Sequence, residues 1–272
     1  MDARGAHGAA VMSDAAPAMS ERLRNEILPP LVILAAVLGF WELAVKALDI
    51  PPWLLPAPSD VAVRFFKTGT LWYHTGLTVL EALAGFVISA VLGVALSAGI
   101  VHSRFLERGV FPYVIVSNAI PIIAIIPLLT IWFGFGIAPK VMICSIISFF
   151  PIVTNTTRGL KAADRRVLEF MRSINATRPE ILLKVQLPSA LPFIFASFKI
   201  AASLALVGAV VAEFYSSDRG LGYLIITSAT QLRTDLLFVA IVVLAVLGVS
   251  SFLLFGSLER LATRGERTAE TR

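Results

Sequence analysis

Long apolar runs separated by short polar segments dominate the chain. Each run has about the 20 residues that a helix needs to cross the hydrocarbon core of a bilayer, and the alternation of a membrane β-barrel is missing. The pattern therefore predicts an all-α polytopic membrane protein with six transmembrane helices. The predicted spans lie near residues 27–48, 77–101, 110–132, 137–157, 190–212 and 236–257.

Two segments depart from the simple span pattern. The third predicted span contains Pro112, Pro121 and Pro127, and each proline removes a helical hydrogen bond and kinks the chain, so neighbouring protein must shield this helix. The segment 54–67 instead predicts a short helix lying on the membrane. There Ser59 is the expected N-cap, and the apolar residues that follow it lie four apart.

The composition agrees with a membrane protein, because 57% of the residues are hydrophobic, 15% are charged and the mean hydropathy is +0.83. Soluble domains carry about a quarter of charged residues. The net charge of +5 does not indicate nucleic acid, since the basic residues lie between apolar runs, where lipid headgroups attract them. Cys144 is the only cysteine and the three histidines are scattered, so we expect no disulfide, no metal site and no cofactor.

The distribution of the 23 Lys and Arg residues predicts the orientation. Sixteen lie before the first span, in the loops 102–109 and 158–189, or after the last span, and the positive-inside rule therefore places both termini in the cytoplasm. Residues 1–26 lack the apolar core of a signal peptide and are predicted to form a disordered cytoplasmic tail. The membrane domain is 27–257, and 258–272 is a cytoplasmic C-terminal tail. Five basic residues fall on the outer side: Arg64, Lys67, Lys140, Arg219 and Arg233.

The cytoplasmic segment between the fourth and fifth spans has a pattern too regular for a linker. It predicts a helical hairpin at about 160–188. Asn175 tolerates the left-handed conformation that ends a first helix. Thr177 and Glu180 fit a capping box at the start of a second helix, which Leu187-Pro188 would stop. The apolar residues that can share one face of the first helix are Leu160, Val167, Phe170, Met171 and Ile174.

An apolar stripe on a cytoplasmic hairpin needs a surface that covers it. The ends of the protein's own helices are one candidate, and a separate protein that docks there is the other. The chain contains neither a G-x-x-x-x-G-K-[ST] loop nor a G-x-G-x-x-G turn, so it lacks the motifs of a nucleotide-driven motor. Any energy used for transport must then come from a partner.

The hairpin sequence resembles the EAA motif of binding-protein-dependent ABC transporter permeases, E-A-A-x-x-x-G-x(9)-I-x-L-P. Glu169, Asn175, Val185, Leu187 and Pro188 occupy the matching positions. The departures are Phe170-Met171 for the two alanines, Asn175 for glycine and Val185 for isoleucine. By this resemblance the residues expected to couple to an ATPase are Glu169, Phe170, Met171, Asn175, Ala176, Val185, Leu187 and Pro188.

The segments 55–61, 126–136, 149–160 and 212–225 extend the resemblance to most of the chain. They resemble the branch that imports nitrate, taurine and aliphatic sulfonates, with relatives that carry a thiamine pyrimidine precursor or riboflavin. The resemblance implies a type I ABC importer permease in the bacterial inner membrane. Its expected partners are a second permease chain, usually identical, two cytoplasmic ATPase subunits that hydrolyse ATP, and an extracytoplasmic solute-binding protein. The chain itself would catalyse nothing.

Polar residues inside the predicted spans are candidates for a substrate path, because burying them in a bilayer is costly. Lys199 could offer a counter-charge to an anionic substrate, or extend its ammonium to the cytoplasmic interface. Asn118, beside two prolines, could bind substrate or a freed carbonyl. Glu213, at the outer end of the fifth span, could contact the binding protein, gate the path or mark the membrane surface. Glu42 and Lys46 fit a structural ion pair.

Two other functional classes are possible for a protein with six spans. A secondary transporter would show paired, broken-helix repeats and buried coupling residues, and no repeat is evident. A membrane enzyme would need a cluster of catalytic side chains near one interface, which the scattered histidines do not supply. Dependence of uptake on a co-purified ATPase would separate these classes from the permease. The substrate stays open among sulfonates, nitrate, pyrimidines and flavins.

Overall fold

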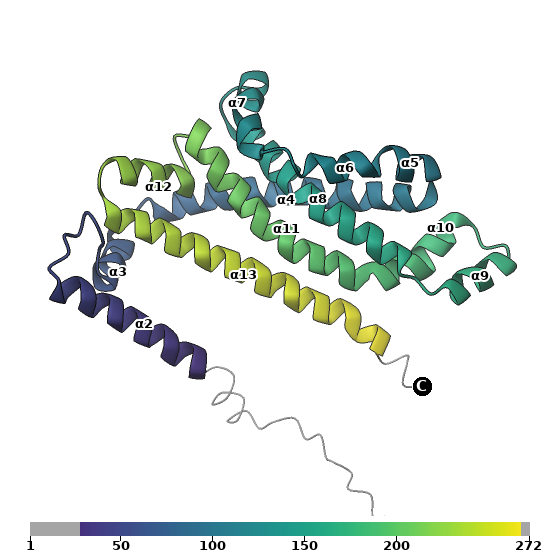
Figure 1. Cartoon of the computed structure of the whole chain (residues 1–272), viewed down its shortest axis with the longest axis horizontal. Coiled ribbons are helices and arrows are strands. Elements are labelled where there is room, and N and C mark those ends of the chain that lie inside the picture. The colour runs from purple at the N-terminus through teal and green to yellow at the C-terminus, as the bar shows by residue number, and fades with distance from the viewer. Residues whose placement is uncertain (1–27, 268–272) are drawn as a thin grey trace, which may run out of the picture.

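A computed structural model of the chain describes residues 28–267, so the predicted tail 1–26 lies outside the described residues. Within that range the regular elements are all helical, and the longest run side by side (Figure 1). The elements are α2 (Leu28–Ala47), α3 (Pro58–Lys67), α4 (Leu71–His102), α5 (Arg104–Gly109), α6 (Phe111–Ser117), α7 (Ile122–Phe133), α8 (Ile137–Lys161), α9 (Arg165–Ser173), α10 (Arg178–Ile181), the π-helical segment η2 (Leu182–Gln186), α11 (Leu187–Ser216), α12 (Leu221–Thr230) and α13 (Thr234–Arg267).

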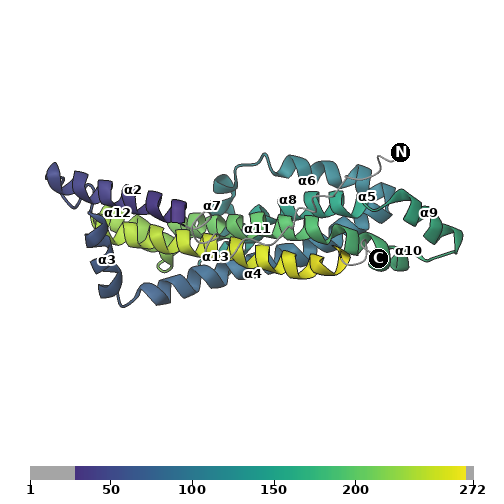
Figure 2. The same cartoon turned by 90° about the horizontal axis from the view of Figure 1, so that it is seen from below.

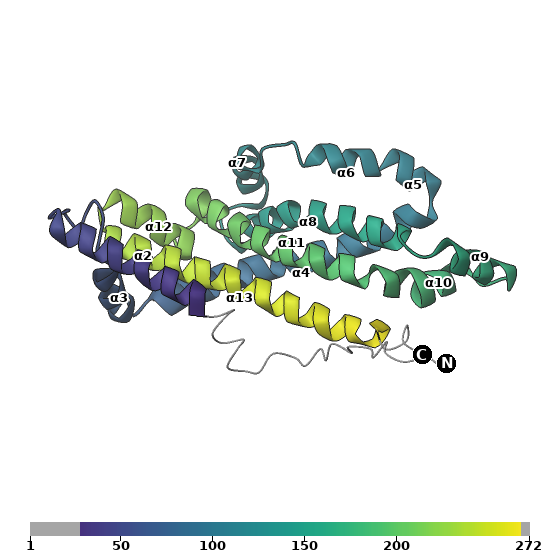
Figure 3. The ribbon, with the colours of Figure 1, turned by 60° about the horizontal axis from the view of Figure 1, so that its bottom comes forward.

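Five helices in the described part of the chain are long and apolar enough to cross a membrane, or six if the bent pair formed by α5–α6 and α7 is one span. This agrees with the six predicted spans. The third span differs from the prediction, because it is broken by a bend of 101° and is not a single kinked helix. Figure 3 shows α6 and α7 as separate helices. Pro121 lies at the break, where its backbone is extended and its missing N–H removes no helical hydrogen bond.

The core of the bundle consists of α4, α8 and α11, in which α8 packs extensively against each of the other two (Figure 1). Small residues make this approach possible. A Cβ atom at Gly85 of α4 would lie 2.3 Å from Cβ of Cys144 in α8, and one at Gly93 would lie 2.7 Å from Cγ2 of Ile152. On α11, the buried residues that complete this core are Ala201, Ala202, Ala205 and Ala209.

The helix α2 lies at the edge of the bundle and is exposed along most of its length. Its Glu42 forms the expected ion pair with Lys46 and accepts hydrogen bonds from the backbone N–H and the hydroxyl of Ser59, at 3.0 and 2.8 Å. The predicted N-cap at Ser59 is therefore wrong. Ala57 is the N-cap of α3, and Asp60 accepts a 3.3 Å hydrogen bond from its backbone N–H.

Two further elements differ from the sequence prediction. The connection after the fifth span contains the helix α12, which the sequence analysis did not predict. The last helix, α13, continues to Arg267, ten residues beyond the predicted end of the sixth span at 257.

Candidate functional site

The predicted hairpin is present as α9, α10 and η2. It projects beyond the long helices at one end of the molecule, whereas α3 and α12 lie at the opposite end (Figures 1 and 2). The chain therefore has two candidate functional regions, the hairpin at one end and a polar cluster at the other.

The first helix of the hairpin ends at Asn175, as predicted. Asn175 has a φ of 56°, in the left-handed region. Its backbone N–H donates to the carbonyl of Arg172 at 3.0 Å, and the N–H of Ala176 donates to the carbonyl of Met171 at 2.9 Å. These two hydrogen bonds form a Schellman motif, which satisfies carbonyls at the end of α9 and fixes the direction in which the chain leaves it.

The second helix of the hairpin begins with the predicted capping box. The backbone N–H and the hydroxyl of Thr177 both donate to Oε2 of Glu180 at 2.8 Å. These two hydrogen bonds, of which the one from the backbone N–H has the larger effect, lower the pKa of the Glu180 carboxyl below its ordinary value. The predicted stop at Leu187-Pro188 is wrong, because the chain stays helical from Arg178 to Ser216 through the π-helical segment η2. The wider π turn just before Pro188 accommodates a residue that has no N–H.

One face of α9 carries exposed apolar side chains. Phe170 is 63% exposed, and Val167 and Ile174 are also exposed. Leu160 does not share this face, contrary to the prediction, because Asp164 caps a new helix after α8 and Leu160 is fully buried at the end of α8. Glu169 is exposed and forms an ion pair with Arg165 one turn earlier, at 2.9 Å.

The remaining residues of the motif are half-buried: Met171, Ala176, Val185, Leu187 and Pro188. Leu187 packs against the buried cluster formed by Leu160, Ala190 and Ile194. Gln186, which the sequence analysis missed, is buried there and its amide donates to the carbonyl of Leu160 at 3.4 Å. The hairpin is therefore attached to α8 and α11 through its half-buried side.

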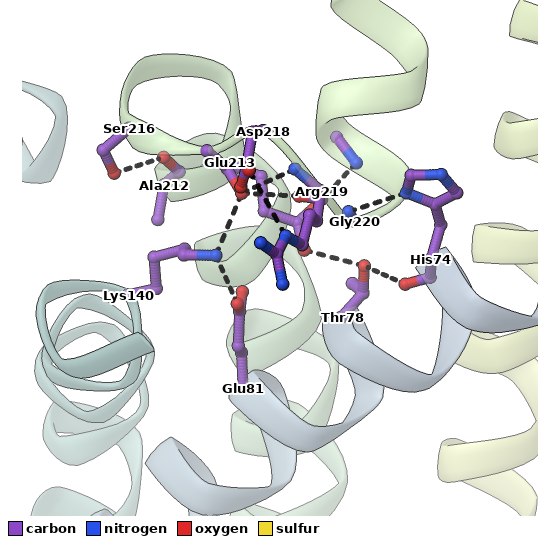
Figure 4. Close-up of polar contacts among 12 residues, drawn as sticks. His74, Thr78, Glu81, Lys140, Ala212, Glu213, Ser216, Asp218, Arg219 and Gly220 are labelled. Carbon is purple, nitrogen blue, oxygen red and sulfur yellow. Dashed lines mark hydrogen bonds and ion pairs between the residues drawn. The ribbon is translucent and has the colours of Figure 1, made fainter. Parts of the chain in front are cut away.

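The polar cluster at the other end of the molecule joins α4, α8 and the segment after α11 (Figure 4). Lys140 of α8 is only 5% exposed and forms an ion pair with Glu81 of α4, which is 1% exposed. Lys140 also donates to the hydroxyl of Ser217 at 3.0 Å. The sequence analysis placed Lys140 on the outer side and did not predict its burial or its partner.

Glu213 of α11 belongs to the same cluster, and it is 1% exposed. It accepts hydrogen bonds from the hydroxyl of Thr78 at 2.7 Å and from the backbone N–H of Gly222 at 2.5 Å. Gly222 lies in the first turn of α12, where a negative charge is favourable. Glu213 therefore anchors the start of α12, and it is not an exposed residue at the end of the fifth span.

The three residues proposed for a substrate path do not meet. Lys199 and Glu213 are fourteen residues apart on α11, about 21 Å along a helix. Lys199 forms an ion pair with Glu259 of α13, and its ammonium lies 5.7 Å from the ring centroid of Phe252. Asn118 is exposed at the end of α6, beside the break in the third span.

The Glu81–Lys140 pair is the main feature that sequence reasoning missed. A signal was available, because Glu81 is an acidic residue inside the second apolar span and an intramembrane acid calls for a partner. The sequence alone does not identify that partner, since Lys140 lies 59 residues away.

Comparisons with known proteins agree on one class of protein, the membrane components of transport systems. The family described as "Binding-protein-dependent transport system inner membrane component" matches residues 85–264. The chain is 37% identical over 238 residues to the riboflavin transport system permease protein RibX of Chloroflexus aurantiacus, covering 86% of this chain and 89% of the relative. It is 32% identical over 238 residues to the putative aliphatic sulfonates transport permease protein SsuC of Escherichia coli, covering 86% and 90%.

The fold is also found among solved structures. An inward-facing structure of the MetNI methionine ABC transporter contains a chain that matches with a TM-score of 0.61 and 22% sequence identity. The match covers 74% of this chain and 97% of that chain. At this identity the likeness concerns the fold.

Proposed function

The chain belongs to the family of binding-protein-dependent transport system inner membrane components and is a permease subunit of an ABC importer, and from this premise we propose how it works with its partners. Two copies of the chain enclose the solute pathway. Two cytoplasmic ATPase subunits, which are separate chains, bind the hairpins and hydrolyse ATP. An extracytoplasmic solute-binding protein delivers the solute at the end where α3 and α12 lie. The assembly then moves a small organic solute or anion across the inner membrane.

The observation that carries this proposal is the apolar outer face of α9, held in a fixed direction. Phe170 and its neighbours on that face project beyond the bundle with no cover from the described residues. The left-handed residue Asn175 and the capping box at Thr177 fix both helices of the hairpin. A helix that offers apolar anchors at this spacing suits docking in a groove of a partner. The half-buried side of the hairpin can then pass motion of the partner to α8 and α11.

The proposed orientation places the hairpin in the cytoplasm. The basic residues concentrate at this end, which the positive-inside rule assigns to the cytoplasm. The helix α2 begins at its end away from α3, and α13 ends toward the hairpin end of the molecule (Figure 1). Both termini are accordingly proposed to be cytoplasmic.

For the solute path, Asn118 remains the proposed contact at the break in the third span, where backbone is irregular. Lys199 could act as a counter-charge only for an anion that displaces Glu259, the carboxylate with which it is paired. Glu213 is proposed to act indirectly, by holding the start of α12.

Cysteine cross-linking tests the proposed docking. A Phe170→Cys variant, treated with a thiol cross-linker in membranes that contain the ATPase, should give a permease–ATPase product. The native Cys144 is fully buried and should not react with the cross-linker. The matched control is Trp72→Cys, because Trp72 is also exposed but lies near the start of α4, at the end of the molecule away from the hairpin. A product from Trp72→Cys, or none from Phe170→Cys in an assembled complex, would contradict the proposal.

A further inference from the structure

A cavity of about 760 Å³ lies between the end of α4 and the hairpin. It is far from the Glu81 cluster, which lies at the other end of the molecule. Its wall combines three arginines with apolar side chains, and the described residues that line it include neither Asp nor Glu. The lining residues that matter here are Val101, Arg104, Leu168, Arg172, Arg178 and Ile181. The cavity therefore has the charge of a site for an anion.

The three arginines have no carboxylate partner within residues 28–267. The acidic residues of the neighbouring segments are paired with other bases: Glu107 with Lys161, Glu169 with Arg165, and Glu180 with Lys184. Arg178 donates from Nη1 to the carbonyl of His102 at 3.4 Å, which holds it at the end of α4 and leaves its other N–H groups available. Since like charges repel, three guanidinium groups around one cavity favour an anion between them.

The position of the cavity favours a lipid as the source of that anion. The apolar helix α4 ends at His102, so under the proposed orientation the cavity lies close to the headgroups of the cytoplasmic leaflet. Anionic lipids give this leaflet a negative surface, and basic pockets at this level bind their headgroups. Val101, Leu168 and Ile181 add an apolar part to the same wall, which suits the glycerol backbone and acyl chains of a lipid better than a soluble phosphate.

The cavity is also separate from the surface proposed to bind the ATPase. Leu168 and Arg172 line the cavity, whereas Phe170 and Ile174 belong to the exposed apolar face of α9. At 3.6 residues per turn these two pairs lie on nearly opposite sides of the helix. An ATPase docked on Phe170 therefore leaves the cavity open to a lipid.

We propose that this cavity binds the phosphate group of an anionic phospholipid, such as phosphatidylglycerol, through Arg104, Arg172 and Arg178. The planar guanidinium group presents paired N–H donors that match two phosphate oxygens. Because the three arginines belong to α5, α9 and α10, a bound headgroup links the hairpin to the end of α4. The inference uses the proposed orientation and no property of the transported solute.

Native mass spectrometry of the full-length permease tests the proposal. The protein is purified in detergent and titrated with phosphatidylglycerol and phosphatidylcholine that have the same acyl chains. The expected result is saturable binding of phosphatidylglycerol, roughly tenfold or more tighter than that of phosphatidylcholine. Equal binding of the two lipids would overturn the proposal.

A matched pair of variants on α9 separates a defined site from diffuse attraction to a basic surface. Arg172→Gln should weaken phosphatidylglycerol binding by roughly tenfold, because it removes a charged donor from the cavity. Arg166 is exposed on the same helix and does not line the cavity, so Arg166→Gln should leave binding nearly unchanged. An equal loss in the two variants, or no loss in Arg172→Gln, would contradict the site.

A second pair, on the other side of the cavity, decides the question if Arg172→Gln disturbs the hairpin. Arg104→Gln should weaken phosphatidylglycerol binding, whereas Arg108→Gln, one turn later on α5 and outside the cavity, should not. Glycerol 3-phosphate serves as the soluble probe. If it binds as tightly as the lipid, the site belongs to a soluble phosphate and the lipid assignment is wrong. All these measurements use the permease alone, so their failure is distinct from a failure of ATPase docking or of uptake.

Discussion

Asn175 shows how one residue can set the geometry of a functional element. Its left-handed backbone turns the chain between α9 and α10, and the two hydrogen bonds at the end of α9 depend on that turn. Glycine adopts this conformation without steric cost and asparagine adopts it more readily than most residues. A β-branched residue there is strained.

Substitution of Asn175 therefore gives a direct test of the hairpin geometry. Asn175→Gly should retain ATP-dependent uptake, whereas Asn175→Val should reorient α10 and reduce both uptake and co-purification of the ATPase. Insertion of the permease in the membrane should be the same for both variants, because the change does not touch the spans. Uptake by reconstituted vesicles and recovery of the ATPase measure the effect. Equal activity of the two variants would show that the direction of the hairpin is not important for coupling.

Residues whose partners are close in sequence could be predicted, and residues with distant partners could not. Asn175 and Thr177 make hydrogen bonds within a few residues, and their local patterns predicted them correctly. Ser59 instead hydrogen-bonds to Glu42, seventeen residues away, so its use as a cap was wrongly predicted. The partner of Glu81 could not be derived from the sequence for the same reason.

At the scale of elements, the contact between α4 and α8 depends on glycine. Gly85 lies against Cys144 so closely that a Cβ atom there would overlap its side chain, and the nearest backbone atom of α8 would be only 2.8 Å away. Interiors are densely packed, so the helices themselves must move apart to accept even one methyl group. By contrast, Gly76 on the same helix has open space around it.

This difference predicts the outcome of a matched pair of substitutions. Gly85→Ala should destabilise the permease by about 1–3 kcal/mol, the usual effect of overpacking a core. Gly76→Ala, in the same helix, should be neutral or slightly stabilising, because alanine favours helix more than glycine. Thermal unfolding in detergent, followed by circular dichroism, measures both. An equal effect of the two substitutions would contradict the tight packing of α4 on α8.

Proline positions predicted irregular helices but not the form of the irregularity. Pro127, Pro151 and Pro192 lie inside continuous helices, whereas the break in the third span falls at Pro121. Pro188 is accommodated by a π-helical segment. Whether a helix bends, breaks or widens depends on neighbours that can satisfy the freed carbonyls, and the chain sequence does not contain that information locally.

At the scale of the whole molecule, the hairpin and the polar cluster of Glu81, Lys140 and Glu213 lie at opposite ends of the bundle. The ion pair of Lys140 lies near the start of α4 and of α8, and the half-buried side of the hairpin rests on α8 and α11. Under the proposed function, movement of the hairpin by an ATPase would therefore act on helices that also carry this cluster. An alternating-access mechanism requires that such a movement shift the bundle between two arrangements.

The orientation of the molecule in the membrane underlies the proposed function and can be tested with single cysteines. Phe66 on α3 is 84% exposed at the proposed outer end, and Phe170 on α9 is exposed at the proposed cytoplasmic end. A membrane-impermeant maleimide added to cells with a permeabilised outer membrane should label Phe66→Cys at once. It should label Phe170→Cys only after the inner membrane is opened by detergent. Cys144, which is fully buried, should stay unlabelled in both cases. The reverse pattern would place the hairpin outside, where no ATP is available, and would remove the basis for coupling through α9.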